Sequence, residues 1–514
     1  MTYKFSVMIP VHYILFFVLA ISIPLIAQEQ EEVKKEDESE VAVVPDADGI
    51  EDPGLAAGSV APSWALMYAP AKFEFLKNWT VERGARLRKS TTQPYRHVVV
   101  VSFFGLILSF VNSDFSNETV FNNSHTTKPL FYKISGTWGN HEGSLLLWLL
   151  VLTLFIFIFL IKSTNQPKKY RILTLLFQQV IIIGFFLFLL KTSNPFNYLF
   201  PIPKEGLGLN PILQDPALAI HPPILYLGYV GSSIIFSASL AAVVEKHIST
   251  VWAKHIKVWI LVSWIFLTFG IMLGSIWAYY ELGWGGFWFW DPVENVSLMP
   301  WFCLTALVHC ILVLEKRLLL SSWTVILSIA TFMLSMSGTF LVRSGILNSV
   351  HTFANDPERG IFILIFLFTL IFFSLAIFFI FHKENNQKIV EIYWLSKETS
   401  ILFNNWFLMY FLSVVLIGTV YPIFLEVLSG EKISVGSPFY HKLIIPFLIP
   451  FLIFMSIGPN LNWIKSEVKK INILYVWSDI FIFGDFRIYS TRFTRDDIFN
   501  NFGIIFCKIF KHNV

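Results

Sequence analysis

Long apolar runs recur along most of the chain and dominate its pattern of hydrophobic and polar positions. Runs of roughly 17 to 22 apolar residues are long enough to cross a membrane as helices. We predict eleven such spans, near residues 8–27, 97–112, 144–161, 172–191, 222–244, 259–277, 298–314, 322–342, 361–381, 403–425 and 442–463. Two further pieces, 471–484 and 497–510, are shorter and interrupted by charge, and we expect them to be interfacial or peripheral. The pattern predicts an all-α, polytopic integral membrane protein.

Positive charge alternates between successive loops. The loops 162–171, 245–257, 315–321, 382–400 and 464–471 hold 15 Lys and Arg residues, whereas 113–143, 191–221, 277–300, 343–360 and 426–442 hold 8. Because Lys and Arg gather in loops on the inner side of a membrane, the second set is predicted to face outward. The loop 277–301 therefore lies on the outer side.

Composition supports a lipid environment. Of 514 residues, 55% are hydrophobic and 14% charged, with a mean hydropathy of +0.62, whereas soluble domains carry about 25% charged residues. A lipid bilayer is therefore the expected surroundings. The net charge of +3 says nothing about nucleic acid, and no nucleic-acid partner is expected. Cys303, Cys310 and Cys507 form no Cys-x-x-Cys pair, so the chain is neither a haem-attached c-type cytochrome nor a dithiol exchanger.

The first hundred residues differ from the rest. Residues 1–27 are predicted to form a first span or signal-anchor, with a cleaved signal as the alternative. Residues 28–96 are polar and in part acidic, which is typical of a partly disordered segment. Arg83, Arg86, Arg88, Lys89 and Arg96 favour the inner side for it. The richness in Phe, Ile, Leu and Asn suggests an organelle-encoded origin, which codon usage would test.

The loop 277–301 concentrates aromatic residues. It reads Trp-Gly-Gly-Phe-Trp-Phe-Trp-Asp from Trp284 to Asp291. An interfacial aromatic belt is the simpler interpretation, because indole rings prefer the headgroup zone. Such a belt does not explain the adjacent Gly285-Gly286 pair, since glycine lets a backbone approach a flat ligand closely. The indole faces of Trp284, Trp288 and Trp290 favour a large planar ligand, with Asp291 and Glu294 as polar groups at its rim.

These residues closely resemble the WWD domain signature of haem-handling proteins in cytochrome c-type biogenesis, and within them the CcmF family. Further motifs match in order: Trp138-Gly-Asn-His-Glu-Gly-Ser, Leu213-Gln-Asp-Pro-Ala-Leu-Ala-Ile-His-Pro-Pro, Gly338-Thr-Phe-Leu-Val-Arg-Ser-Gly and Ile433-Ser-Val-Gly. The resemblance covers about 101–463, within a predicted transmembrane core of 97–463 that is followed by a divergent tail, 464–514. Phe287 stands where the family usually has another tryptophan.

Three histidines are candidate haem-iron ligands. His309 lies about ten residues into the span after the loop, near mid-membrane, where an ionisable residue indicates function. Its position alone leaves open an iron ligand or a packing histidine. The resemblance implies that His309 binds a b-type membrane haem, and that His221 and His351, in outer loops, are the two axial ligands of the haem being delivered. We expect Pro222-Pro223 to hold His221 near the outer end of its span.

Other polar residues have weaker indications. His141 matches a family motif but has no clear role. Arg343 ends a span on the outer side, where a guanidinium either binds a haem propionate or reaches to the interface. Either Glu281 or Asp291 could contact ligand. Eight histidines are expected to be ordinary hydrated or interfacial side chains: His12, His97, His125, His247, His255, His382, His441 and His512.

The resemblance implies a subunit of the cytochrome c haem lyase, acting only with partner chains. It would position haem from the chaperone CcmE for thioether attachment to a Cys-x-x-Cys-His motif of apocytochrome c, with a CcmH-like thiol partner and quinol as electron source. Full-length members continue beyond the equivalent of Trp463, so a second CcmF fragment is expected to supply the other membrane histidine; loss of the b haem is the alternative. The mitochondrion inner membrane is the expected location, with a bacterial inner membrane as the alternative.

The sequence leaves two rival functions open. One is a WWD-type haem transporter of the CcmC kind, which the length and the motifs around His141 and His309 disfavour. The other is a structural membrane subunit of a respiratory assembly, derived from the lyase. Retention of His221, His309 and His351 argues against it.

Overall fold

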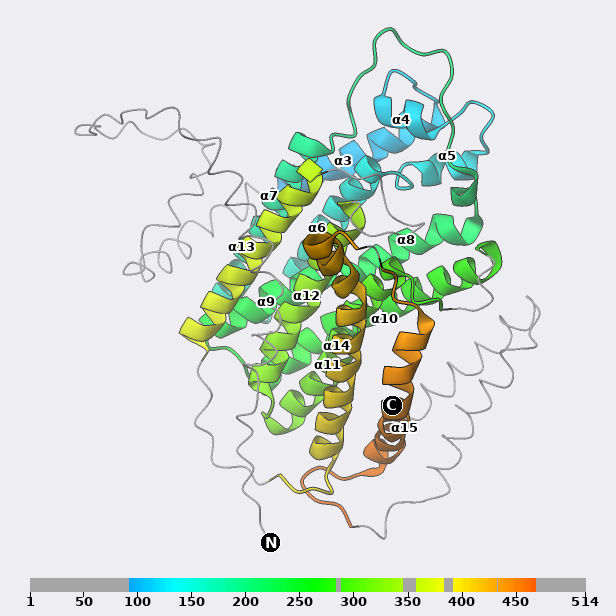
Figure 1. Ribbon diagram of the computed structural model, residues 1–514. Coiled ribbons are helices and arrows are strands. Elements are labelled where there is room, and N and C mark those ends of the chain that lie inside the picture. Colours follow the sequence, from blue (N-terminus) through cyan, green and yellow to red (C-terminus); the bar gives the residue numbers. More distant parts are fainter. Residues whose placement is uncertain (1–91, 283–287, 345–356, 383–391, 432, 468–514) are drawn as a thin grey trace, which may run out of the picture. The chain divides into compact units, whose positions relative to one another are not determined.

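A computed structural model describes residues 92–282, 288–344, 357–382, 392–431 and 433–467 (Figure 1). The chain divides into residues 1–89 and 90–514, and every described residue belongs to the second unit. The predictions for 1–27, for most of 28–96 and for 468–514 therefore lie outside the described residues.

The described elements are helices. They are α3 (Thr92–Val111), α4 (Glu118–Asn123), α5 (Leu130–Gly136), α6 (His141–Lys162), α7 (Lys168–Thr192), α8 (Pro216–Tyr229), α9 (Ser232–Val244), α10 (Thr250–Glu281), α11 (Pro292–Arg317), α12 (Ser321–Arg343), α13 (Pro357–Phe381), α14 (Lys397–Ser429) and α15 (Ser437–Ile457). Short 3-10 turns lie at η3 (Pro211–Leu213) and η4 (Gly458–Asn460). Within the described ranges, strand pairing is limited to an isolated bridge between Asn117 and Tyr198.

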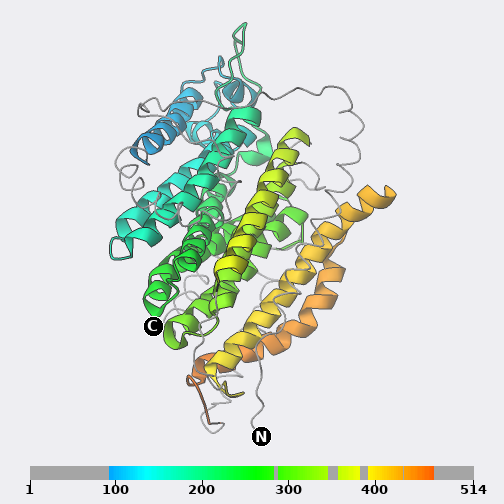
Figure 2. The same cartoon turned by 90° about the vertical axis from the view of Figure 1, so that its left-hand side faces the viewer.

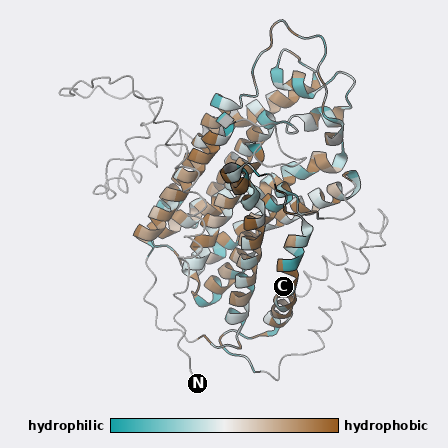
Figure 3. Cartoon of the chain, in the orientation of Figure 1, coloured by the Kyte–Doolittle hydropathy of each residue, from teal (hydrophilic) through white to brown (hydrophobic). Residues whose placement is uncertain are grey.

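The prediction of a polytopic, all-α membrane protein is confirmed. Among the described residues, nine helical segments are long and apolar enough to cross a membrane, and they correspond to the last nine predicted spans. Figure 3 shows apolar residues along these long helices. The predicted span 97–112 falls in α3, whose apolar part Val99–Val111 is shorter than a full crossing. The predicted span 222–244 is wrong at its start, because α8 begins at Pro216 and runs into α9 after a break at Val230–Gly231.

Helix α11 lies at the centre of the bundle, in contact with α10, α12 and α14. Two indole-to-hydroxyl hydrogen bonds join α10 to α11: Trp264 Nε1 donates to Thr305 Oγ1 at 2.9 Å, and Trp301 Nε1 donates to Thr268 Oγ1 at 2.8 Å. Such bonds between small polar groups and indoles hold membrane helices together where burial of apolar surface gives little driving force.

Helices α8 and α10 cross at very short range. A Cβ atom at Gly228 would lie 2.2 Å from the backbone nitrogen of Leu267, and one at Gly270 would lie 2.5 Å from Leu225 Cα. These glycines let the two backbones touch. On another side of the bundle, α14 and α15 run side by side (Figure 2).

Candidate functional site

We call the segment from Trp284 to Asp291 the tryptophan loop. Its described end, residues 288–291, rests on α15. The Trp290 ring stacks on Tyr440 with centroids 4.4 Å apart and planes 7° from parallel. Trp290 Nε1 also donates to His441 Nε2 at 3.2 Å. Trp284 belongs to 283–287 and lies outside the described residues. The loop is therefore fixed by a helix that follows it by about 150 residues, counted from the 151 that separate Trp290 and His441.

Trp290 adopts an unusual backbone conformation, with φ of +62°. The left-handed region costs a non-glycine residue on the order of 1 kcal/mol, so neighbouring contacts must offset it. Asn295, which is fully buried, donates from Nδ2 to the Trp290 carbonyl at 3.2 Å and to the Tyr440 hydroxyl at 3.0 Å. One amide thus ties the strained residue to its stacking partner.

Asp291 and Glu294 form a capping box at the start of α11. Asp291 Oδ2 accepts from the Val293 amide at 3.0 Å, and Glu294 Oε2 accepts from the amides of Phe289 at 3.0 Å and Asp291 at 3.2 Å. This arrangement satisfies backbone donors that a helix start leaves open. Both carboxylates, expected as polar groups at the ligand's rim, have a structural task here, and a ligand contact by Asp291 remains a prediction.

Trp288 completes the described aromatic surface. Its ring meets Trp290 edge-on with centroids 6.1 Å apart. Its Nε1 is buried and has no hydrogen-bond partner among the described residues. A buried indole N–H normally finds an acceptor, so this group is an exception among the described residues.

His221 lies in a helix, so its predicted place in an outer loop is wrong. Asp215 caps α8 by accepting from the amides of Ala217 at 2.8 Å and Leu218 at 3.0 Å, and Pro216 follows at the first helical position. Both residues favour a helix start there, which places His221 in the second turn. His221 Nδ1 lies 2.6 Å from the carbonyl oxygen of Gly270 on α10.

Two prolines sit inside α8 directly after this histidine. Pro223 has no N–H and cannot bond to the carbonyl of Ala219, four residues earlier. Trp138 Nε1 donates to that carbonyl instead, at 2.9 Å. Trp138 opens the motif that runs to Ser144, so this motif supports the helix that carries His221.

The same motif holds Arg343, which is buried with 3% of its surface exposed. Arg343 Nη1 lies 3.3 Å from His141 Nδ1 and donates to the His141 carbonyl at 3.2 Å, while Nη2 donates to Ser144 Oγ at 2.9 Å. His141 Nε2 lies 3.1 Å from Ser193 Oγ. Arg343 therefore lies inside the protein and does not reach to the interface. A propionate contact remains a prediction.

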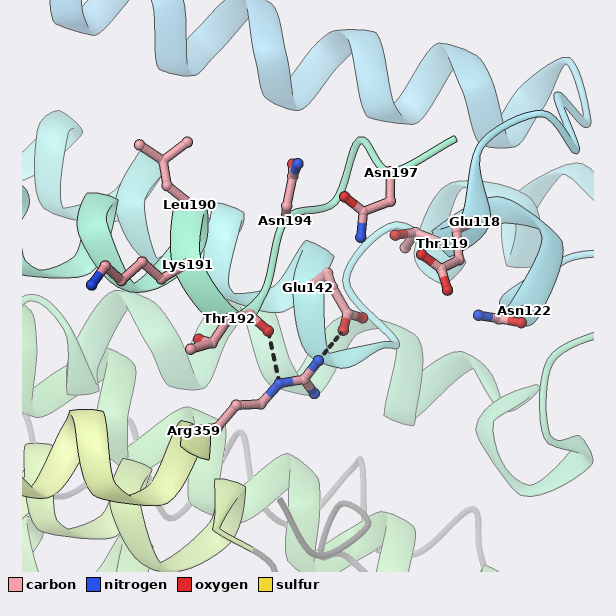
Figure 4. Close-up of a pocket in the computed structure, with 10 residues that line it drawn as sticks. All are labelled: Glu118, Thr119, Asn122, Glu142, Leu190, Lys191, Thr192, Asn194, Asn197 and Arg359. Atoms are coloured by element: carbon pink, nitrogen blue, oxygen red, sulfur yellow. Dashed lines mark hydrogen bonds and ion pairs between the residues drawn. The ribbon is translucent and has the colours of Figure 1, made fainter. Parts of the chain in front are cut away.

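Arg359 near the start of α13 contacts the motif as well. It donates to Glu142 Oε1 at 2.9 Å and to the Thr192 carbonyl at 2.9 Å (Figure 4). The pair borders a polar cavity of about 280 Å³ that also contacts Glu118 and Lys191. Arg343 and Arg359 flank residues 345–356, which include His351 and lie outside the described residues. The structure does not place His351 relative to His221.

His309 lies well inside α11 and is only half-buried. Its Nδ1 is 3.3 Å from Asn405 Oδ1 on α14, and Asn405 Nδ2 donates to Cys310 Sγ at 3.1 Å. Cys303 and Cys310 are buried. A half-buried imidazole at membrane depth, with one ring nitrogen beside an amide oxygen, fits a haem-iron ligand.

Several residues that support the site were not predicted from the sequence. His441 was expected to be an ordinary interfacial histidine, yet it accepts a hydrogen bond from the tryptophan loop. The sequence around His441 carries no pattern from which its pairing with Trp290 could be predicted. Asn405 does carry such a signal, because an amide within an apolar span is costly unless it has a partner. Asp291-Pro-Val-Glu294 also carried a readable capping signature.

Comparisons with known proteins agree on one family. The family model "Cytochrome C assembly protein" matches residues 138–347. The chain is 49% identical over 394 residues to "Cytochrome c-type biogenesis protein CycK" of Bradyrhizobium diazoefficiens, covering 75% of this chain and 59% of that protein. It is 42% identical over 403 residues to "Cytochrome c-type biogenesis protein CcmF" of Escherichia coli, covering 77% of this chain and 62% of that protein.

A solved structure is also similar. "Cytochrome c Heme Lyase CcmF" superimposes with a TM-score of 0.61 at 28% identity, covering 82% of this chain and 65% of that one. The chain thus spans about six tenths of the length of the curated relatives that it matches.

Proposed function

Because this chain belongs to the CcmF family of cytochrome c assembly proteins, we propose that it is a subunit of the haem lyase that completes c-type cytochromes. The observation that carries the proposal is the environment of His221. Its Nδ1 meets a backbone carbonyl at 2.6 Å, which is how proteins commonly orient a histidine that binds a metal through its other nitrogen.

The substrate of this reaction is haem, delivered in our proposal by the chaperone CcmE. His221 and His351 would hold its iron from both sides, and Trp284, Trp288 and Trp290 would offer aromatic contact to its flat face. Two thiols of apocytochrome c then add to its two vinyl groups. Each sulfur bonds to one vinyl carbon and a proton goes to the other, so no group leaves and no nucleophile from this chain is needed. The chain contributes orientation.

A resident membrane haem is the second part of the proposal. His309 would hold it, with Asn405 orienting the ring. When bound, a b-type haem there supplies an electron-transfer centre, for which quinol is the proposed electron source. In this proposal, a second CcmF fragment would provide the other membrane histidine.

The setting of the reaction is a further part of the proposal. The chain is a membrane protein of cytochrome c biogenesis. We propose that a CcmH-like partner presents the reduced thiols, and that the tryptophan loop faces the intermembrane space of a mitochondrion. The relatives named above are bacterial, so the bacterial inner membrane is the alternative location.

Visible spectroscopy of the complex, purified gently with its partners, tests the proposal. We expect a reduced b-type spectrum that His309→Ala abolishes, and a separate haem signal on loading by CcmE that His221→Ala abolishes while the b-type signal stays. A complex that carries no haem under any gentle extraction would contradict the lyase and favour a structural subunit.

A further inference from the structure

The hydrogen bond at His221 fixes where its proton lies. Its Nδ1 is 2.6 Å from the carbonyl oxygen of Gly270. A carbonyl oxygen only accepts, so Nδ1 must be the donor. In the neutral ring, the lone pair is then on Nε2.

The ring reaches this carbonyl because α10 has a second glycine one turn further on. A Cβ atom at Gly274 would lie 2.7 Å from His221 Cε1 and 3.1 Å from Nδ1. Real Cβ atoms do not approach a ring that closely, so any larger residue at 274 must displace the imidazole. Gly270 can serve as acceptor within a helix because a carbonyl oxygen has two lone pairs.

The position of α8 is fixed independently. Trp138 holds the Ala219 carbonyl at 2.9 Å, two residues before the histidine. At the other end of α8, Gly228 lies against the backbone of Leu267. The turn that carries His221 is therefore held from the motif at 138–144 on one side and from α10 on the other.

We propose that Gly270, Gly274 and Trp138 are positioning residues that lock His221 in the tautomer with the proton on Nδ1, and so select Nε2 as the iron-binding nitrogen. The ligand role of His221 rests on the proposed function, whereas its tautomer is a property of the protein without haem. A histidine so held is a stronger donor to iron, because its N–H bond is polarised by the carbonyl. Losing the bond should raise the reduction potential of haem bound there.

The test begins without haem. The full chain in detergent is labelled with ¹⁵N-histidine, and its spectrum is recorded at about pH 8, above the ordinary pKa range of histidine. His221 is assigned by difference from His221→Gln. We expect the Nδ1–H tautomer in the wild type. In Gly274→Ala, we expect a loss of that single form. A proton on Nε2, or on both nitrogens, in the wild type overturns the proposal.

A matched control separates this effect from a general change in the membrane helices. At Gly105 an added Cβ would meet nothing within 4 Å, so Gly105→Ala should leave the His221 signal unchanged. If Gly274→Ala folds and keeps the wild-type signal, the glycine has no positioning role. Where Gly274→Ala does not fold, Trp138→Phe replaces it, with the same expected mixture of tautomers.

Hemin added to the same samples distinguishes this proposal from the proposed function. A low-spin spectrum that depends on His221, combined with a mixed tautomer in the wild type, contradicts the positioning proposal alone. A locked Nδ1–H tautomer without any His221-dependent hemin spectrum supports the positioning and contradicts the ligand role.

Discussion

The indole nitrogen of Trp138 replaces a backbone donor that Pro223 removes, by donating to the carbonyl of Ala219 at 2.9 Å. The two residues are therefore complementary. A proline is tolerated inside α8 because a side chain from another element satisfies the carbonyl that it leaves open.

Trp138→Phe keeps an aromatic ring but removes the donor. We expect it to lower the free energy of unfolding by about 1 to 3 kcal/mol, because a part-buried carbonyl loses its partner. Pro223→Ala restores a backbone N–H for the same carbonyl. In the double variant, Trp138→Phe should therefore cost less than it does alone. Thermal unfolding in detergent compares the stability of the wild type, the two single variants and the double variant. Additive losses of stability would show that the two residues are not coupled.

Tyr440 supports the tryptophan loop through its ring. Tyr440→Leu should destabilise the protein by about 0.5 to 1.5 kcal/mol beyond the loss of buried area, because the stack with Trp290 disappears. Tyr440→Phe keeps the ring and loses only the hydroxyl that Asn295 contacts. Tryptophan fluorescence during chemical unfolding compares them. Equal losses in both variants would mean that the hydroxyl, and not the stack, holds the loop.

Substitution by lysine should lower the stability of the protein much more at Arg343 than at Arg359. Arg343 is buried and bonds through both terminal nitrogens, so Arg343→Lys should cost about 2 to 3 kcal/mol, since lysine lacks the planar fork. The Arg359–Glu142 pair is partly exposed, with 24% and 22% of the side chains accessible, so Arg359→Lys should cost less than about 1 kcal/mol. The midpoints of thermal unfolding of the two variants measure this difference. A larger loss of stability in Arg359→Lys than in Arg343→Lys would contradict the prediction.

The lowered pKa of Lys128, in the connection before α5, should make the stability of the protein depend on pH. Burial, and then the nearby Lys133 ammonium, lower this pKa from 10.5 to about 8. Between these values the unfolded chain binds more protons than the folded one, so stability rises with pH in that window. Lys128→Met removes the effect. The stability difference between wild type and variant should shift in favour of the wild type from pH 8 to 10.5, and a constant difference would contradict the lowered pKa.

Asn405 is expected to tune the proposed membrane haem. Its Oδ1 accepts from His309 Nδ1 in the orientation that the Cys310 contact favours. Asn405→Leu removes this acceptor, and the less basic imidazole should raise the haem's reduction potential. Asn404→Leu is the control, because Asn404 Oδ1 is buried without a partner among the described residues. A redox titration followed by visible absorption measures both, and equal shifts would exclude a specific role for Asn405.

Nine of the eleven predicted membrane spans have a counterpart among the described helices, because such spans depend on local composition alone. The start of α8 could have been predicted as well, since Asp215-Pro216 is a helix-start signature, but hydropathy placed the boundary at 222 instead. The contacts of Trp290 with Tyr440 and of Trp138 with Ala219 had no such signal. They join residues that are far apart in sequence, and only the packing of the helices brings them together.

The stack of Trp290 on Tyr440 also sets an order of events during synthesis. The partner residues on α15 are made about 150 residues after the loop, which at ribosomal speed is roughly 8 to 30 s later. Throughout that interval the loop lacks the surface on which its described end rests. The nascent chain therefore cannot stack Trp290 on Tyr440 until α15, its last described α-helix, has been made.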